Sequence, residues 1–538
     1  MKEGGGMGTY VNPGNTAFSR IAGPDYVDKT GLISLINQRI GSDNSLICIS
    51  RPRRFGKTYA AKMLAAYYDC SCDSHDLFDT ARVSKSPLYK TYLNQFNVIC
   101  FDVTTFISDI KTVNGSLRDV PAMIQEAIRK DLNALGFQEE TGDSLNDYLL
   151  RCVRQADGRQ FIFIIDEWDA LIREAKEDAI AQEAYLNLLR GWFKSVSFTP
   201  KAVAAAYITG ILPIKKDGSQ SAISDFREYS MIEPGAYAEY FGFTEEEVRT
   251  ICFDNDLSFE DARYWYDGYT VGLSHSMYNP YSIREAVENR RFRSYWRKTS
   301  AAEALMTYID MDQDGLQNDV ASLISGQSIE VDTDSFQNDF ETFSCKDDVL
   351  TLLIHLGYLT YTEEEGTGIA TIPNEEVRIE FRKILRRSKH QQLIDLVRKS
   401  DQLLRDTLEG RSDAVSRAIH AVHDTSFAPT FYNEEQALRY TVKMAYISCV
   451  DQFARVEELP SGHGIADLVY IPKKRSSLPT MIVELKWSKG AAGAIAQIKN
   501  RNYQNIPLQI GTDILLVGID YDEKTKQHTC RIEIIRNH

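Results

Sequence analysis

Short apolar runs alternate with helix-like segments in the first 210 residues, and this alternation restricts the fold more than any other feature of the sequence. The runs with the length of buried strands are residues 45–50, 97–103, 161–166 and 202–210. Helical patterns follow three of them, at 57–68, at 121–135 with proline in the first turn, and after the third run through Leu189. Strands that alternate with helices predict a parallel sheet covered by helices on both faces. We therefore expect an α/β domain.

The segment between the first strand and its helix reads RPRRFGKT, residues 51–58. It ends like the phosphate-binding loop G-x-x-x-x-G-K-[ST], but Arg51 stands where that pattern has its first glycine. In such a loop the backbone N–H groups and the helix N-terminus surround an anion, the lysine reaches the outer phosphates and the hydroxyl binds Mg²⁺. Arg51 alters the start of the turn without removing these amides, although a basic surface turn also fits the segment taken alone. The residues expected to bind the nucleotide here are Arg53, Arg54, Phe55, Gly56, Lys57 and Thr58.

An acidic pair ends the third apolar run, in the stretch FIIDEWD. We expect Asp166 to hold Mg²⁺ through water and Glu167 to orient the water that attacks the γ-phosphate. Thr209, at the end of the fourth run, is a candidate sensor of that phosphate, although threonine is also an ordinary strand residue. Acids at strand ends are common, so the prediction of ATP and Mg²⁺ binding depends on their combination with the loop. Hydrolysis of ATP is a further expectation.

A second polar set lies on apolar, strand-like segments near the C-terminus. Asp467 lies in IADLVYIP, and Glu484 and Lys486 lie in MIVELKW. Strand periodicity places Glu484 and Lys486 on one face, and a buried acid beside a lysine is costly unless it serves a function. Two carboxylates can chelate Mg²⁺, and a lysine can position or help to deprotonate an attacking water. The pattern predicts a metal-dependent site that cleaves phosphodiesters; an ordinary Glu/Lys pair on an exposed sheet is the alternative.

Two helix-like segments flank this second set. The earlier one contains Glu434 and Glu435, either of which can add a carboxylate, and we favour Glu434. The later one carries Gln497, which can lean over the site. The candidate catalytic residues of the chain are Glu167, Glu434, Asp467, Glu484, Lys486 and Gln497.

Nine stretches occur in the order typical of one family. They are YVDKTGLI, ISRPRRFGKT, FIIDEWDAL, YITGILPIKK, WYDGYTVG, YNPYSI, LGYLTY, IPNEEV and the segment from IADLVYIP through VELKW to AIAQIKNRNY. On these stretches the chain resembles prokaryotic AAA-ATPase-like proteins with a C-terminal PD-(D/E)XK nuclease-superfamily domain. The arginine-rich loop resembles that family's own form of the phosphate loop. One departure from RecB-type nucleases is that Arg501 stands four residues after Gln497, where their Q-x-x-x-Y motif has tyrosine.

The resemblance implies an α/β multidomain protein. Its expected parts are a P-loop parallel-sheet ATPase domain at 1–232, a helical lid at 233–339, a winged-helix-like and helical linker at 340–410, and a restriction-endonuclease-like α/β domain at 411–538. The aromatic run YWYDGY at 264–269 is interpreted as lid core rather than as a base-stacking surface.

The composition and charge of the chain restrict the kinds of partner that it can bind. From residue 431 onward 14 Lys and Arg stand against 12 Asp and Glu, whereas the rest carries 47 against 64, within a net charge of −15. The acidic bulk argues against a general nucleic-acid coat but leaves room for a local basic surface near the C-terminus. The apolar runs are too short to span a bilayer, and the nine scattered cysteines are typical of a reducing cytosol. We expect a cytoplasmic protein that binds ATP and DNA and no membrane. Homo-oligomers are a possibility, because AAA-like sites often take an arginine from a neighbour, for which Arg227 is a candidate.

An ATP-regulated, Mg²⁺-dependent DNA nuclease is the leading hypothesis, in the setting of defence or mobile-element biology. The alternative is a nucleotide-dependent switch or scaffold whose nuclease-like domain only binds a partner or nucleic acid. In that alternative the winged helix and the basic helical segment 378–399 would provide the binding surface.

Overall fold

The computed structural model divides the chain into two compact units. The first consists of Met1–Arg297 and Glu330–Val377, and the second of Lys298–Ile329 and Arg378–His538. The residues that the structure describes are 8–214, 223–272, 274–296, 315–334, 336, 345–385, 391–425, 434–461, 464–472, 478–500 and 513–536. The two units cut across the four predicted segments, because the stretch after residue 297 joins the C-terminal unit and the stretch after residue 329 joins the N-terminal one.

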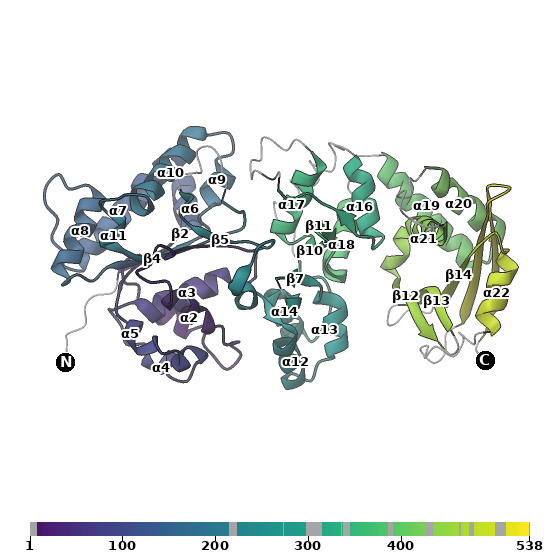
Figure 1. Ribbon diagram of the computed structural model, residues 1–538, viewed down its shortest axis with the longest axis horizontal. Helices are drawn as coiled ribbons and strands as arrows, with labels where there is room; N and C mark the ends of the chain where they lie inside the picture. The colour runs from purple at the N-terminus through teal and green to yellow at the C-terminus, as the bar shows by residue number, and fades with distance from the viewer. Residues whose placement is uncertain are drawn as a thin grey trace. The chain divides into compact units, whose positions relative to one another are not determined.

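A five-stranded sheet in the order β2-β3-β4-β1-β5 forms the centre of the N-terminal unit (Figure 1). Its strands are β1 (Leu46–Ser50), β2 (Asn97–Asp102), β3 (Phe161–Asp166), β4 (Val203–Gly210) and β5 (Arg227–Tyr229). All neighbouring strands pair in parallel. The four predicted strands and the parallel sheet are confirmed, and β5 adds a short fifth strand at one edge. Because the strands are parallel, the loops that follow β1, β3 and β4 leave the sheet at the same end.

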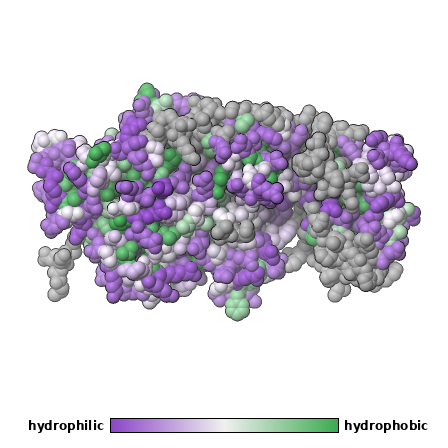
Figure 2. Space-filling view, viewed as in Figure 1, coloured by the Kyte–Doolittle hydropathy of each residue, from purple (hydrophilic) through white to green (hydrophobic). Residues whose placement is uncertain are grey.

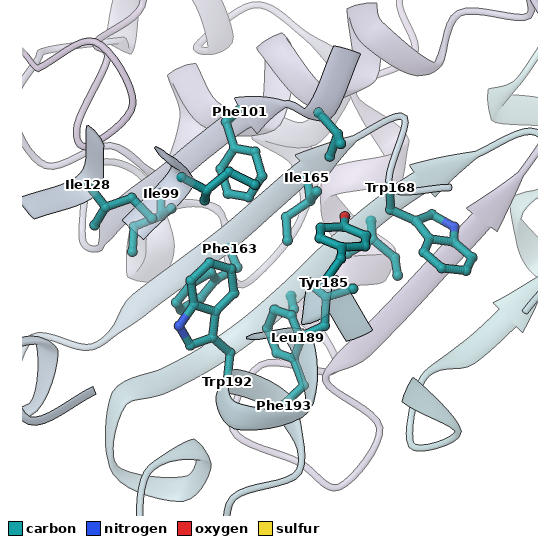
Figure 3. Close-up of a cluster of buried hydrophobic side chains, with 14 of the residues drawn as sticks. Ile99, Phe101, Ile128, Phe163, Ile165, Trp168, Tyr185, Leu189, Trp192 and Phe193 are labelled. Carbon is teal, nitrogen blue, oxygen red and sulfur yellow. The ribbon is translucent and has the colours of Figure 1, made fainter. Parts of the chain in front are cut away.

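Strands β1 to β4 supply side chains to two cores, one on each face of this sheet. Leu46 and Cys48 belong to one core and Ile47 and Ile49 to the other, as the two-residue period of a strand requires. Figure 3 shows part of the first core, where Phe163 of β3 lies beside Trp192. The helices that contribute to that core are α6 (Val103–Thr112), α7 (Val120–Ala134), α8 (Leu145–Gln155), α9 (Ala170–Glu174) and α10 (Ala179–Phe193). The second core is covered by α2 (Gly31–Asn37) and α3 (Lys57–Tyr68).

Shorter helices complete this part of the unit. They are α1 (Thr16–Ser19), α4 (His75–Phe78), α5 (Tyr89–Tyr92) and α11 (Thr199–Ala202). Helices α3 and α7 match their predicted positions to within a residue at each end.

The segment predicted as a helical lid is only partly helical. It contains α12 (Glu245–Asp254), α13 (Phe259–Tyr266) and α14 (Pro280–Asn289). It also contains an antiparallel sheet in the order β6-β8-β7, formed by β6 (Phe243–Thr244), β7 (Tyr269–Val271) and β8 (Ser274–Tyr278). The aromatic run that ends at β7 has Tyr266 and Tyr269 buried, so it contributes to the interior as interpreted. The short strands escaped prediction because aromatic and β-branched residues stand among helical patterns there.

The winged-helix-like segment has the predicted order of helix, hairpin and helix. Helix α17 (Lys346–Leu356) ends at Gly357, whose φ of 81° is left-handed. Strands β10 (Thr360–Glu364) and β11 (Thr367–Thr371) pair in antiparallel fashion, and β9 (Ile329–Glu330) joins their sheet beside β11. Helix α18 (Glu375–Leu385) follows. The basic segment expected at 378–399 therefore falls on two helices, α18 and α19 (Gln391–Leu408), and residues 386–390 lie outside the described part.

A five-stranded mixed sheet in the order β12-β13-β14-β15-β16 forms the centre of the C-terminal unit. Its strands are β12 (Phe453–Ser461), β13 (Gly464–Pro472), β14 (Thr480–Trp487), β15 (Ile514–Asp522) and β16 (Gln527–Ile535). Only β14 and β15 pair in parallel, and α22 (Ala491–Asn500) connects them. The other helices are α16 (Leu316–Ile324), α19, α20 (Ser412–Thr425) and α21 (Glu434–Ala445). Helix α16 contacts α21 within this unit through the hydroxyls of Ser322 and Tyr440, 2.9 Å apart.

On the face drawn in Figure 2, hydrophilic residues predominate and hydrophobic ones occur as small separate spots. Within the described ranges, no helix combines the length and the apolar content that a membrane span requires.

Candidate functional site

The loop after β1 contains two left-handed residues directly before a helix, a feature of anion-binding loops. Arg54 and Gly56 have φ values of 71° and 96°, and α3 begins at Lys57 directly after them. Left-handed residues in such a turn direct successive N–H groups toward one point, where the partial positive charge of the helix N-terminus adds to them. A Cβ atom on Gly56 would meet no atom within 4 Å, so the positive φ rather than lack of space requires glycine here.

Lys57 folds back over its own loop. Its ammonium donates to the carbonyl oxygens of Arg51 at 2.9 Å and Pro52 at 3.2 Å, and it lies 3.6 Å from Oε1 of Glu167. The side chain is only 4% exposed. Lysine therefore bridges the phosphate loop and the residue after β3, which brings together two motifs that lie about a hundred residues apart in the chain.

Asp166 and Thr209 meet at the ends of β3 and β4. The Thr209 hydroxyl donates to Oδ1 of Asp166, and both side chains are buried. The backbone N–H of Glu167 donates to the same oxygen at 3.1 Å. Oδ2 of Asp166 has no hydrogen-bond partner among the described residues. A buried carboxylate oxygen of this kind is a suitable metal ligand, because hard cations prefer carboxylate oxygens.

Arg51, the residue in place of the first glycine, is structural. Its side chain is fully buried and donates to the carbonyl oxygens of Ser50, Tyr229 and Ser230 at 2.9, 2.8 and 2.6 Å. These bonds join the start of the loop to the end of β5. Burial lowers the pKa of Arg51 to about 10. Burial and the nearby Arg51 together lower the pKa of His355 on α17 to about 3.

The second candidate site lies where β13 and β14 run side by side. Leu468 pairs with Val483, and extending this antiparallel register by one residue places Asp467 opposite Glu484. Glu484 is buried, and its Oε1 accepts from Lys486 at 3.2 Å and from the amide of Gln497 on α22. Four of the predicted nuclease residues are therefore neighbours on two strands and one helix.

Donors from β14 and α21 contact Asp467. Its Oδ2 accepts from the backbone N–H of Leu485 at 2.8 Å, and its Oδ1 lies 3.3 Å from the guanidinium of Arg439 on α21. Helix α21 begins at Glu434, but the side chains of Glu434 and Glu435 lie outside the described part. No group of three His, Cys, Asp or Glu side chains within the described ranges is arranged to hold a metal ion. The proposed third carboxylate thus stays a prediction.

Comparison with known proteins bears on the N-terminal unit. Residues 14–219 match the family model described as "Predicted AAA-ATPase", and this match includes the phosphate loop, the acidic pair and Thr209. Residues 14–219 are thus similar to predicted AAA-ATPases. The match does not reach the C-terminal unit, so the nuclease part of the resemblance stays a prediction.

The comparisons also give a relative and a solved structure. An "Uncharacterized protein in vnfD 5'region" of Azotobacter chroococcum mcd 1 is 23% identical over 525 residues, which are 93% of each chain. This similarity therefore extends across both units. The solved "Structure of the Aeropyrum Pernix ORC2 protein (ADPNP-ADP complexes)" is 11% identical and covers 68% of this chain and 98% of its own, with a TM-score of 0.28. At that TM-score the likeness supports no conclusion about the fold.

Arg53, Arg54 and Phe55 were predicted to bind the nucleotide, but their side chains have different surroundings. Arg53 is exposed. Arg54 instead lies over the ring of Tyr281 on α14, 4.2 Å from its centre. Phe55 is fully buried and contacts Tyr269 edge to face, so only its backbone is available to a nucleotide. These side chains were grouped with the loop because sequence spacing gives no direction for a side chain in a turn.

Two residues near the acidic pair were missed. Arg173 on α9 lies 2.5 Å from Oε2 of Glu167 and 3.0 Å from Oδ2 of Asp169. Burial opposes the charge of Arg173, but Asp169 and Glu167 outweigh it and raise its pKa. The i, i+4 spacing of Asp169 and Arg173 was the available sequence signal. Arg227, the candidate for a shared arginine, lies on the edge strand β5 and donates to Asn44.

Proposed function

We propose that the N-terminal unit binds and hydrolyses ATP with Mg²⁺. The observation that carries this proposal is the contact between Lys57 of the phosphate loop and Glu167 after β3, 3.6 Å apart, beside the buried Asp166. An ordinary basic turn has no reason to meet a second strand-end motif in this way. The match of residues 14–219 to predicted AAA-ATPases supports the proposal.

The residues of this site have separate tasks. The loop amides and the N-terminus of α3 bind the phosphates, and Lys57 leaves its loop carbonyls to contact the outer ones. Glu167 accepts a hydrogen bond from the attacking water and orients it. Thr58, exposed on the first turn of α3, and Asp166 would hold Mg²⁺, which would offset the negative charge of the phosphates. Thr209 fixes the orientation of Asp166 through its hydroxyl.

Equilibrium binding and phosphate release test this function. Wild type should bind an ATP analogue and release phosphate in Mg²⁺. Lys57→Ala should lose binding, whereas Glu167→Gln should retain binding and lose hydrolysis by about 100-fold or more. Lys90→Ala, at an exposed lysine of the same unit, is the control and should behave as wild type. A wild type that does not bind ATP would overturn the proposal.

For the C-terminal unit we infer a second activity, Mg²⁺-dependent cleavage of DNA. The support is that four residues from β13, β14 and α22 lie close together: Asp467, Glu484, Lys486 and Gln497. An acid that is only 1% exposed and paired with a lysine is costly to maintain for stability alone. Asp467 and Glu484 would hold Mg²⁺, which would stabilise charge on the scissile phosphate, and Lys486 would position the attacking water.

A cleavage assay separates this function from its alternative. Purified protein is incubated with single- or double-stranded DNA, with Mg²⁺ or Mn²⁺, and with or without ATP. Glu484→Ala should abolish cleavage, and Glu523→Ala, at an exposed acid of the same unit, should not. Cleavage that responds to ATP would mean that the two activities are coupled. No cleavage in any nucleotide state, with ATP still bound, would favour the switch or scaffold, whose C-terminal unit only binds a partner or nucleic acid.

A further inference from the structure

A chain of ionic and hydrogen bonds supports Glu167. Its Oε2 lies 2.5 Å from the guanidinium of Arg173, and the Nε of that guanidinium donates to Oδ2 of Asp169 at 3.0 Å. The same Asp169 oxygen accepts from the backbone N–H groups of Ile211 and Leu212, at 3.2 and 3.0 Å, directly after β4. Glu167 is thus connected through two side chains to the end of the neighbouring strand.

The two oxygens of Glu167 have different neighbours. Oε1 lies 3.6 Å from Lys57, and Oε2 contacts Arg173. Lys57 belongs to the phosphate loop, whereas Arg173 lies on α9 and is anchored by the buried Asp169. When Lys57 turns toward bound phosphates, Oε1 becomes available to water while Oε2 keeps its partner. Glu167 also has a φ of 52°, which is unusual for a residue with a side chain, so its backbone already holds a constrained orientation.

We propose that Arg173 is a positioning residue for ATP hydrolysis, which holds Oε2 of Glu167 so that Oε1 faces the attacking water. This inference rests on the proposed ATPase function. In the hydrolytic step the water oxygen bonds to the γ-phosphorus, and the bond from that phosphorus to the bridging oxygen breaks, with its electron pair leaving on ADP. The water proton passes to Oε1 of Glu167 and then to solvent. Arg173 touches none of the reacting atoms and acts only through Glu167.

Steady-state kinetics of Arg173→Gln in the full chain test the role. We expect kcat to fall on the order of 10- to 100-fold, as for misplacement of a catalytic group, with KM and the affinity for a non-hydrolysable ATP analogue nearly unchanged. Arg173→Lys should restore part of kcat, because it keeps the charge but not the fork of donors. Arg118→Gln, which breaks the exposed ion pair with Asp178, is the matched control and should leave kcat unchanged.

A double variant separates positioning from a structural effect. If Arg173 acts through Glu167, Arg173→Gln should slow hydrolysis no further once Glu167→Gln is present. Additive losses, an unchanged or higher kcat in Arg173→Gln, or an equal loss of analogue binding would overturn the inference. If Arg173→Gln does not fold, Arg173→Lys alone decides: a kcat below wild type with intact analogue binding supports the inference, and a wild-type kcat overturns it. A wild type that binds but does not hydrolyse ATP would refute the ATPase proposal and this inference together, whereas hydrolysis that is insensitive to Arg173 would refute only the latter.

Discussion

His355 should make the N-terminal unit sensitive to acid. It lies on α17, is 2% exposed, and sits near the buried Arg51 at the start of the phosphate loop. Its pKa in the folded state is lowered from 6.5 to about 3, by burial first and by Arg51 second. Because the folded pKa is below the unfolded one, the unfolded chain binds a proton first as the pH falls. The stabilisation from a neutral His355 is therefore complete above pH 6.5 and is lost progressively toward pH 3.

The size of the effect follows from these two pKa values. Between about pH 7 and about pH 5 one such histidine should lower the free energy of unfolding by about 2 kcal/mol, since each pH unit within the window is worth about 1.4 kcal/mol. His355→Leu removes the titrating group. Over that pH range the free energy of unfolding of the variant should therefore fall by about 2 kcal/mol less than that of wild type, whatever the variant's stability at neutral pH.

Urea unfolding followed by tryptophan fluorescence measures this difference. His528 in the C-terminal unit also has a pKa lowered to about 3, by burial and by His423 and His420. The fluorescence change must therefore report the unfolding of the N-terminal unit alone. Trp487 is the one tryptophan of the sequence in the C-terminal unit, and a Trp487→Phe background removes its signal. Phe253→Leu, at an exposed side chain of the N-terminal unit that does not titrate, is the control and should keep the wild-type pH dependence. Equal losses in wild type and His355→Leu would refute the reasoning.

Three further outcomes test the two sites. Thr209→Val removes the hydroxyl that donates to Asp166, so we expect about 1–3 kcal/mol less stability and slower phosphate release, and unchanged values in both assays would argue against the bond. Gly56→Ala keeps open space but forces a φ of 96° on alanine, which should cost about 1–2 kcal/mol in urea unfolding and weaken ATP binding measured by calorimetry. Arg439→Gln frees Oδ1 of Asp467 from an ion pair worth on the order of 0.5–1 kcal/mol. Binding of Mn²⁺, followed by titration, should tighten a few-fold, and weaker binding would instead mean that Arg439 positions Asp467 for the metal.

Strong local sequence patterns were sufficient to predict much of the fold. The apolar runs of β1 to β4, with helices between them, predicted a parallel sheet, because the strands of such a sheet are apolar on both faces. The helix that ends at Gly357 and the hairpin after it were also readable, because a left-handed helix end and a short turn depend on neighbouring residues alone. The three short strands of the segment predicted as a lid could not be predicted, since their pairing joins residues from separate helical stretches.

The candidate sites likewise have some features that the sequence predicts and others that only the tertiary structure decides. Residue type and spacing alone singled out Lys57, Asp166 and Glu167, and likewise the acids and lysine near the C-terminus, because each chemistry requires particular side chains at strand ends. Tertiary structure alone decided that Arg51 is buried against β5, that Arg54 lies over Tyr281, and which partners hold each carboxylate. It likewise decided that the stretch after residue 297 belongs to the C-terminal unit. The reason is physical: a side chain's direction and its partner depend on elements far away in the sequence, whereas its chemical type does not.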